Sequence, residues 1–260
     1  MKTRTVTTLL SALLLLVVPV LASAQGRAPL DAKLKRAQAR IAKGQRLLTK
    51  GSFAGAEEAF REAMKLRPDV PGSYVGVGAA LVGQKKFAEA IPLLKEAEEK
   101  FVGFERNLQS AQMQSQQWAG NRESVGISHV ETTHPGADYS AQGTHRSMVD
   151  LIQERLAADP TLKPKKWSVE ELSAIPAQVF YFEGVAYLRS GDRAAGVRAL
   201  RQCLLIDPNY GLAHYNLAVA EFMAGHAKEA KGHLDAAVAA GVKANPKFVS
   251  DVDKAVEGAQ

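Results

Sequence analysis

Residues 44–63 read GQRLLTKGSFAGAEEAFREA, and residues 184–203 read GVAYLRSGDRAAGVRALRQC. The two stretches carry small residues at the same three places and large apolar residues at two further places. Antiparallel helices approach closely only where small side chains let the backbones near, while large side chains fill the space on either side. Each stretch therefore predicts a helical hairpin, and the recurrence of the pattern predicts a repeat protein.

The same pattern extends outward over four windows of 34 residues, 37–70, 71–104, 177–210 and 211–244. The eighth, twentieth and twenty-seventh positions of each window are small, and the eleventh and twenty-fourth are large and apolar with one exception, Glu221 at the eleventh position of the last. Gly51, Gly191 and Gly225 stand where the first helix of a hairpin would end in a left-handed cap. We therefore expect two pairs of adjacent helical hairpins.

Several segments resemble the signature of the tetratricopeptide repeat. They include residues 51–60, GSFAGAEEAF, and residues 213–218, AHYNLA, together with Tyr74 and Phe180 at the aromatic fourth position. Arg40 and His214 depart from the signature at that position. The resemblance implies an all-α fold, a right-handed superhelical solenoid of antiparallel helical hairpins with an irregular central insertion.

The central span, residues 105–176, has 72 residues, which is the length of two repeats with four residues over. We read it as two degenerate repeats that carry an inserted loop or small hairpin at 119–143. Residues 105–118 and 144–158 are expected to be helical, and Ser168 with Glu171 predicts a capping box that opens a short helix. Residues 245–258 are expected to form a terminal capping helix with Asn245 as its N-cap.

Residues 1–24 have the three-part layout of a secretory signal peptide, with basic residues, an apolar run and a small-residue end at Ala22-Ser23-Ala24. The apolar run falls short of the roughly 20 residues that span a bilayer. Cleavage before Gln25 is therefore expected, which leaves residues 25–260 as an exported, periplasmic or secreted chain without stable membrane insertion. Retention of the leader as an anchor is the alternative.

Charge and cysteine content exclude several classes of protein. The chain has 33 basic and 27 acidic residues, a mixed balance that argues against a dedicated nucleic-acid binder. A single cysteine, Cys203, cannot form an internal disulfide or supply a multi-cysteine zinc site. Cys203 falls on a small position of the repeat, where we expect it to pack in the core.

The resemblance implies a function as well as a fold. In this family the first helices line a concave groove that commonly holds a peptide or a helix of a partner protein. A non-enzymatic binding or scaffold module without a cofactor is therefore expected, and Asn216 is suited to pairing with a bound backbone. The predicted groove residues are Ile41, Gln45, Leu48, Val75, Ala79, Val82, Tyr181, Val185, Leu188, Arg189, Tyr215, Asn216, Val219 and Phe222.

Two alternatives remain open at this point. The first is a metal or enzymatic site in the insertion 119–145, built from His129, Glu131, His134 or His145, although their spacing does not match ligands on one helix face or in one turn. The second is a self-associating structural protein, whose groove is filled by its own insertion or by another copy. If the insertion fills the groove, Tyr181, Tyr215 and Phe222 would serve as plain core.

Overall fold

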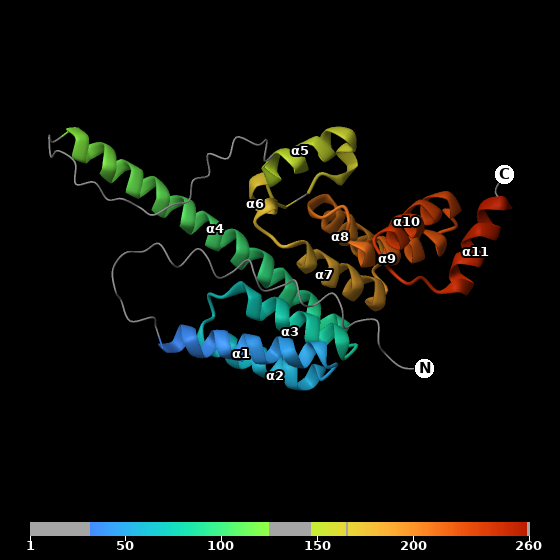
Figure 1. The fold of residues 1–260 in the computed structure, drawn as a ribbon, viewed down its shortest axis with the longest axis horizontal. Helices are drawn as coiled ribbons and strands as arrows, with labels where there is room; N and C mark the ends of the chain where they lie inside the picture. Colours follow the sequence, from blue (N-terminus) through green and yellow to red (C-terminus); the bar gives the residue numbers. More distant parts are fainter. Residues whose placement is uncertain (1–31, 125–146, 165, 259–260) are drawn as a thin grey trace. The chain divides into compact units, whose positions relative to one another are not determined.

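The computed structural model describes residues 32–124, 147–164 and 166–258. Helices account for the regular structure of these residues, without a strand among them, so the all-helical fold class is confirmed. The residues form two compact units, one of residues 101–175 and the other of the flanking segments. The helices are α1 (Ala32–Thr49), α2 (Phe53–Leu66), α3 (Pro71–Gly83), α4 (Phe87–Ser124), α5 (Met148–Ala158), the 3-10 turn η3 (Pro160–Leu162), α6 (Val169–Ser173), α7 (Ala177–Ser190), α8 (Arg193–Ile206), α9 (Gly211–Phe222), α10 (Ala227–Ala239) and α11 (Pro246–Glu257) (Figure 1).

The flanking unit contains the expected hairpins, α1 with α2, α3 with the first turns of α4, α7 with α8, and α9 with α10. In three of them a glycine at the eighth position faces a large residue at the twenty-fourth. A Cβ atom built on Gly44, Gly78 or Gly184 would lie only 2.7, 2.5 or 2.6 Å from the side chain of the opposing residue. The opposing residues are Phe60, Leu94 and Leu200, respectively, and all three are buried. These helices are therefore as close as their side chains permit.

The turns inside the hairpins share a left-handed residue at one position. Gly51, Gly191 and Gly225 have φ angles of 73°, 94° and 82°, which confirms the predicted caps. In the second hairpin the equivalent residue is Lys85, with φ of 63°. A non-glycine residue seldom adopts this conformation, so nothing at Lys85 marks the turn in the sequence.

The third hairpin packs directly against the second. Helix α7 contacts α3, and Phe182 and Ala186 join the core that contains Leu81 and Leu94. The Lys95 ammonium group on α4 lies 5.7 Å from the centre of the Tyr187 ring on α7. The prediction that residues 105–176 fill the space of two repeats is therefore wrong, because no room is left between α3 and α7 for another hairpin.

The unit of residues 101–175 has its own architecture. Helix α4 contains Pro92 and continues beyond Phe104, the last residue of the second window, to Ser124. The loop expected from Ala119 therefore does not begin there. Pro92 lies near the start of the helix, where few hydrogen bonds are lost. The rest of the expected loop, residues 125–143, lies outside the described residues.

Two capping boxes order the shorter helices of this unit. Ser147 opens α5 with Asp150, and Ser168 opens α6 with Glu171, the latter as predicted. The Glu171 carboxylate also pairs with Arg106 on α4. Helices α5 and α6 are thus defined by capping boxes at their N-termini.

Helix α11 closes the last hairpin, as expected for a terminal cap. The Asn245 side chain accepts a hydrogen bond of 2.9 Å from the Lys247 amide at the start of the helix. Val252 is fully buried against the hairpin, and Lys231 on α10 lies 3.2 Å from Asp253. The predicted leader lies outside the described residues, and no described helix is long and apolar enough to cross a bilayer.

The close approach at Gly184 makes a direct prediction about stability. Gly184→Leu should lower the free energy of unfolding by about 3 kcal/mol, because even its Cβ would overlap Leu200. The control is Gly232→Ala on α10, where a Cβ meets no atom within 4 Å. This control should gain up to about 1 kcal/mol from helix propensity. Urea unfolding followed by circular dichroism measures both, and an unchanged midpoint for Gly184→Leu would contradict the assigned register.

Candidate protein-binding surface

The first helices α1, α3, α7 and α9 carry the fourteen predicted groove residues. Three of these side chains, those of Leu48, Val75 and Ala79, are buried, and Arg189 is exposed. The other ten are partly exposed. A position on a first helix therefore does not by itself make a residue available to a partner.

Part of the predicted groove is core between hairpins. Ile41, Leu48, Ala79 and Val82 belong to, or pack against, the same cluster as Phe182 of α7. Such packing explains why α3 is buried at every position from Ser73 to Leu81. The alternative that some groove residues are plain core thus applies to the first two hairpins.

Tyr181 lies in an aromatic group between the third and fourth hairpins. Its ring centre is 5.0 Å from that of Tyr210. Burial raises the pKa of Tyr181 to about 12, so its hydroxyl group stays protonated. Nearby, the Asn216 side-chain amide donates a 2.7 Å hydrogen bond to the Leu212 carbonyl oxygen. Asn216 is therefore already engaged within its own helix.

The predicted groove residues of the last hairpin are covered by α11. The Phe248 ring meets Tyr215 and Phe222 edge to face, with centroid distances of 5.7 and 5.6 Å. Val249 packs against the same cluster. The sequence identified α11 as a cap, but it did not show that the cap rests on these two aromatic residues.

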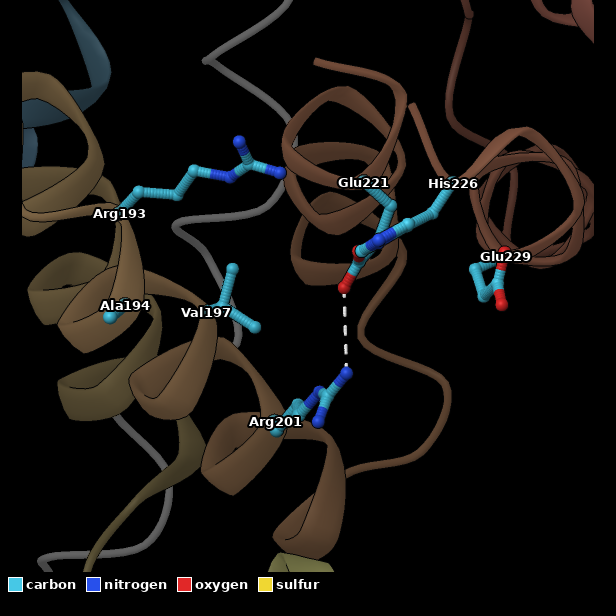
Figure 2. A pocket seen from close by; sticks show the side chains of 7 residues that line it. All are labelled: Arg193, Ala194, Val197, Arg201, Glu221, His226 and Glu229. Atoms are coloured by element: carbon cyan, nitrogen blue, oxygen red, sulfur yellow. Dashed lines mark hydrogen bonds and ion pairs between the residues drawn. The ribbon is translucent and has the colours of Figure 1, made fainter. Parts of the chain in front are cut away.

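Glu221 departs from the apolar pattern and is nonetheless buried, with 6% of the residue exposed. Its carboxylate accepts a 2.8 Å hydrogen bond from His226 Nδ1 and lies 3.4 Å from Arg201 Nη2 (Figure 2). Burial alone would raise the pKa of Glu221, but His226 and Arg201 outweigh it and hold this pKa below its ordinary value. The three side chains line an open pocket of about 550 Å³ with Arg193 and Glu229.

Cys203 is buried on α8, the second helix of the third hairpin. Burial raises the pKa of the Cys203 thiol far above its ordinary range, which keeps it in the unreactive protonated form. No group of three or more candidate metal ligands occurs among the residues that the structure describes. His129, Glu131, His134 and His145 lie outside them, so the metal alternative for the insertion is untested.

Two segments of the chain match models of the tetratricopeptide repeat, residues 41–101 and residues 187–248. The first segment lies within the first pair of hairpins, and the second runs from the end of α7 to the first residues of α11. No curated protein matches the chain.

Several solved structures are similar to this chain at low identity. A crystal structure of MamA protein is 15% identical, covering 86% of this chain and 83% of that one, with a TM-score of 0.42. TTC0263, a thermophilic TPR protein of Thermus thermophilus, is 14% identical, with coverages of 85% and 98% and a TM-score of 0.38. PilF of Pseudomonas aeruginosa is also 14% identical, with coverages of 86% and 86% and a TM-score of 0.36.

The contact of Phe248 with Tyr215 and Phe222 predicts how much α11 contributes to stability. Phe248→Ala should lower the free energy of unfolding by about 2 kcal/mol. This loss is smaller than that for the same substitution at a fully buried phenylalanine, because Phe248 is only partly buried. Val238→Ala on α10, where the valine is 50% exposed, is the control and should change stability by less than about 0.5 kcal/mol. Thermal unfolding followed by circular dichroism measures both, and equal effects would show that α11 does not rest on Phe248.

Proposed function

We propose that this chain, two segments of which match the tetratricopeptide repeat, binds a protein partner through the first helices of its hairpins. Repeats of this family mediate protein–protein interactions. The proposed ligand is an extended segment or a helix of the partner, since both fit a surface made of parallel helix faces.

One observation carries the proposal. Helix α7 presents Val185 partly exposed and Arg189 exposed, one turn apart on the same face. The apolar side chain can bury apolar surface of a partner, and the charged group beside it can fix the orientation of that partner. By contrast, the Tyr215–Phe222 surface of α9 is occupied by Phe248. We therefore place the binding surface on α7 rather than on α9.

The proposed module acts by binding and not by catalysis. Glu221, the buried carboxylate of the last hairpin, is hydrogen-bonded to His226 and paired with Arg201. The Cys203 thiol is held protonated by burial, and the negative charge of Asp207 further disfavours its thiolate. Neither residue has the environment of a nucleophile or a general base at neutral pH.

The binding surface is tested with a double variant on α7, Val185→Ser with Arg189→Glu. We expect the variant to capture at least tenfold less of the partners that the unaltered protein captures from an envelope extract, because it loses an apolar contact and reverses a charge. Quantitative mass spectrometry of the captured proteins gives the ratio.

The matched control makes the same changes on the second helix of the same hairpin, Val197→Ser with Arg198→Glu. Val197 is partly exposed and Arg198 exposed, so the chemical disturbance is equivalent. The control should retain the partners. Equal recovery by the two double variants, or no specific partner of the unaltered protein, would refute the proposed surface.

We further propose that the chain is exported and loses residues 1–24. The support is the order of basic, apolar and small residues in this segment. In a bacterial host, the mature protein should begin at Gln25, as measured by intact mass of the protein from the periplasm or medium. Recovery of the full-length chain in the membrane fraction would contradict cleavage and favour an anchor.

A further inference from the structure

The last hairpin differs from the other three at two matching positions. In the other hairpins, the fourth and twenty-third positions of the window together hold at most one ionisable residue. The pairs are Arg40 and Ala59, Tyr74 and Leu93, and Phe180 and Ala199. In the last hairpin both positions are histidine, His214 on α9 and His233 on α10.

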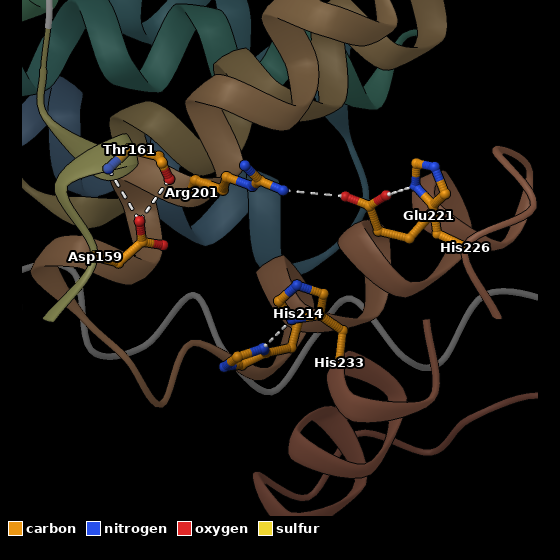
Figure 3. Close-up of polar contacts among 7 residues, drawn as sticks. All are labelled: Asp159, Thr161, Arg201, His214, Glu221, His226 and His233. Carbon is orange, nitrogen blue, oxygen red and sulfur yellow. Dashed lines mark hydrogen bonds and ion pairs between the residues drawn. The ribbon is translucent and has the colours of Figure 1, made fainter. Parts of the chain in front are cut away.

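The two imidazole rings meet head-on. His214 Nδ1 lies 3.0 Å from His233 Nδ1, while the ring centres are 5.2 Å apart (Figure 3). The other nitrogen of His214, Nε2, lies 2.9 Å from the Pro208 carbonyl oxygen. In the second hairpin, the Tyr74 hydroxyl group donates to the Pro68 carbonyl oxygen at 3.0 Å. His214 thus replaces the tyrosine in the link to the preceding hairpin.

This arrangement fixes where the protons must be. A carbonyl oxygen only accepts, so His214 Nε2 carries a proton and donates to Pro208. In the neutral ring, His214 Nδ1 is then an acceptor, and His233 Nδ1 must donate to it. Protonation of both rings places a hydrogen on each of the two facing nitrogens, which abolishes the hydrogen bond and brings two positive charges together. The contact is therefore lost when both rings are charged.

The charged groups around the two histidines have partners of their own. Arg201 on α8 and His226 at the start of α10 both contact the Glu221 carboxylate on α9. Lys231 on α10 pairs with Asp235 and with Asp253 of α11. Burial lowers the pKa of His233, His214 and Arg201 lower it further, and Glu221 opposes them. The net effect favours a neutral His233 ring in the folded state.

The sign of the pH effect follows from this shift. A histidine whose folded pKa lies below its unfolded value of 6.5 binds protons more readily when unfolded. Its contribution to stability is complete above pH 6.5 and is lost as the pH falls toward the folded pKa. Acid therefore destabilises the hairpin that contains the pair.

We propose that the His214–His233 contact is a pH-sensitive device that loosens the last hairpin in mildly acidic solution. Loosening α9 and α10 also loosens α11, because Phe248 rests on Tyr215 and Phe222 of α9. Acidification thus uncovers aromatic residues that are closed at neutral pH. The first two hairpins lack such a pair and keep their stability.

Hydrogen exchange of the full chain at pH 7.5 and 5.0 tests this proposal, with rates corrected for intrinsic exchange and a chelator present. Repeat proteins open locally, so the protection of each hairpin is measured separately. Relative to the amides of α1 and α2, protection of α9 and α10 should fall about tenfold at the lower pH, because the opened hairpin binds protons more readily than the folded one. Equal changes in both hairpins would overturn the proposal.

The decisive variant is His214→Tyr with His233→Leu, which installs the residues of the second hairpin at the same two positions. It should reduce the pH-dependent change to less than about twofold, because neither residue titrates near pH 6. The control, His226→Gln, removes another histidine of the hairpin and should retain the tenfold change. Loss of the effect in the control would assign it to the Glu221–His226 pair instead.

A measurement on the unaltered chain covers the case in which the double variant does not fold. Nitrogen-15 NMR of the histidine rings at pH 7.5 should show a proton on Nε2 of His214 and on Nδ1 of His233. Both rings protonated on Nε2 would leave the two facing nitrogens without a hydrogen, which would overturn the proposed contact.

Discussion

The fold depends on one contact, that between the eighth and twenty-fourth positions of each hairpin. At three hairpins the eighth residue is glycine, and any side chain there would overlap Phe60, Leu94 or Leu200. In the last hairpin Ala218 and Leu234 occupy these positions in a shared core. The distance between the paired helices is thus set by a residue with no side chain in three hairpins and by an alanine in the fourth. The large residue opposite then fills the remaining space and stabilises the hairpin by burial.

The stacking of the hairpins follows from α3, which is apolar on all sides. Such a helix must be covered on every face, and α1, α2 and α7 all contact it. Because α7 supplies one of these faces, the second and third hairpins are neighbours although 72 residues separate their windows in the sequence.

The hairpins themselves could be predicted from the sequence because their determinants are local and periodic. Small and large residues recur at fixed spacing, and Gly51, Gly191 and Gly225 mark the turns. The neighbour of α7 could not be predicted in this way. Phe182 and Ala186, which make the contact, are ordinary apolar residues that fit any adjacent repeat. The length of the central span, close to two periods, pointed to the wrong arrangement.

The positions of the candidate site residues along the chain could be predicted, but their exposure to a partner could not. The family register placed residues on the first helices correctly, but their availability depends on what packs against them. Tyr215 and Phe222 are covered by Phe248, a residue more than 25 positions away that lies outside the four windows of 34 residues. The ion pair of Glu221 and the contact of His214 with His233 were missed because each partner is polar and separately unremarkable. A comparison of matching positions across the four windows would have shown that two histidines coincide in the last.

The direct neighbourhood of the second and third hairpins is the central claim, and a cross-link tests it most directly. Lys95→Cys and Tyr187→Cys, in a chain with Cys203→Ser, place two thiols where the native side chains are 5.7 Å from nitrogen to ring centre. A bismaleimide with a spacer of about 8 Å should join them within one chain under native conditions, since adjacent helices lie about 8–10 Å apart. Two intervening hairpins would separate these positions by at least about 20 Å. Efficient intramolecular cross-linking, seen by peptide mass spectrometry, is the predicted result, and its absence in the folded protein would contradict the continuous stack.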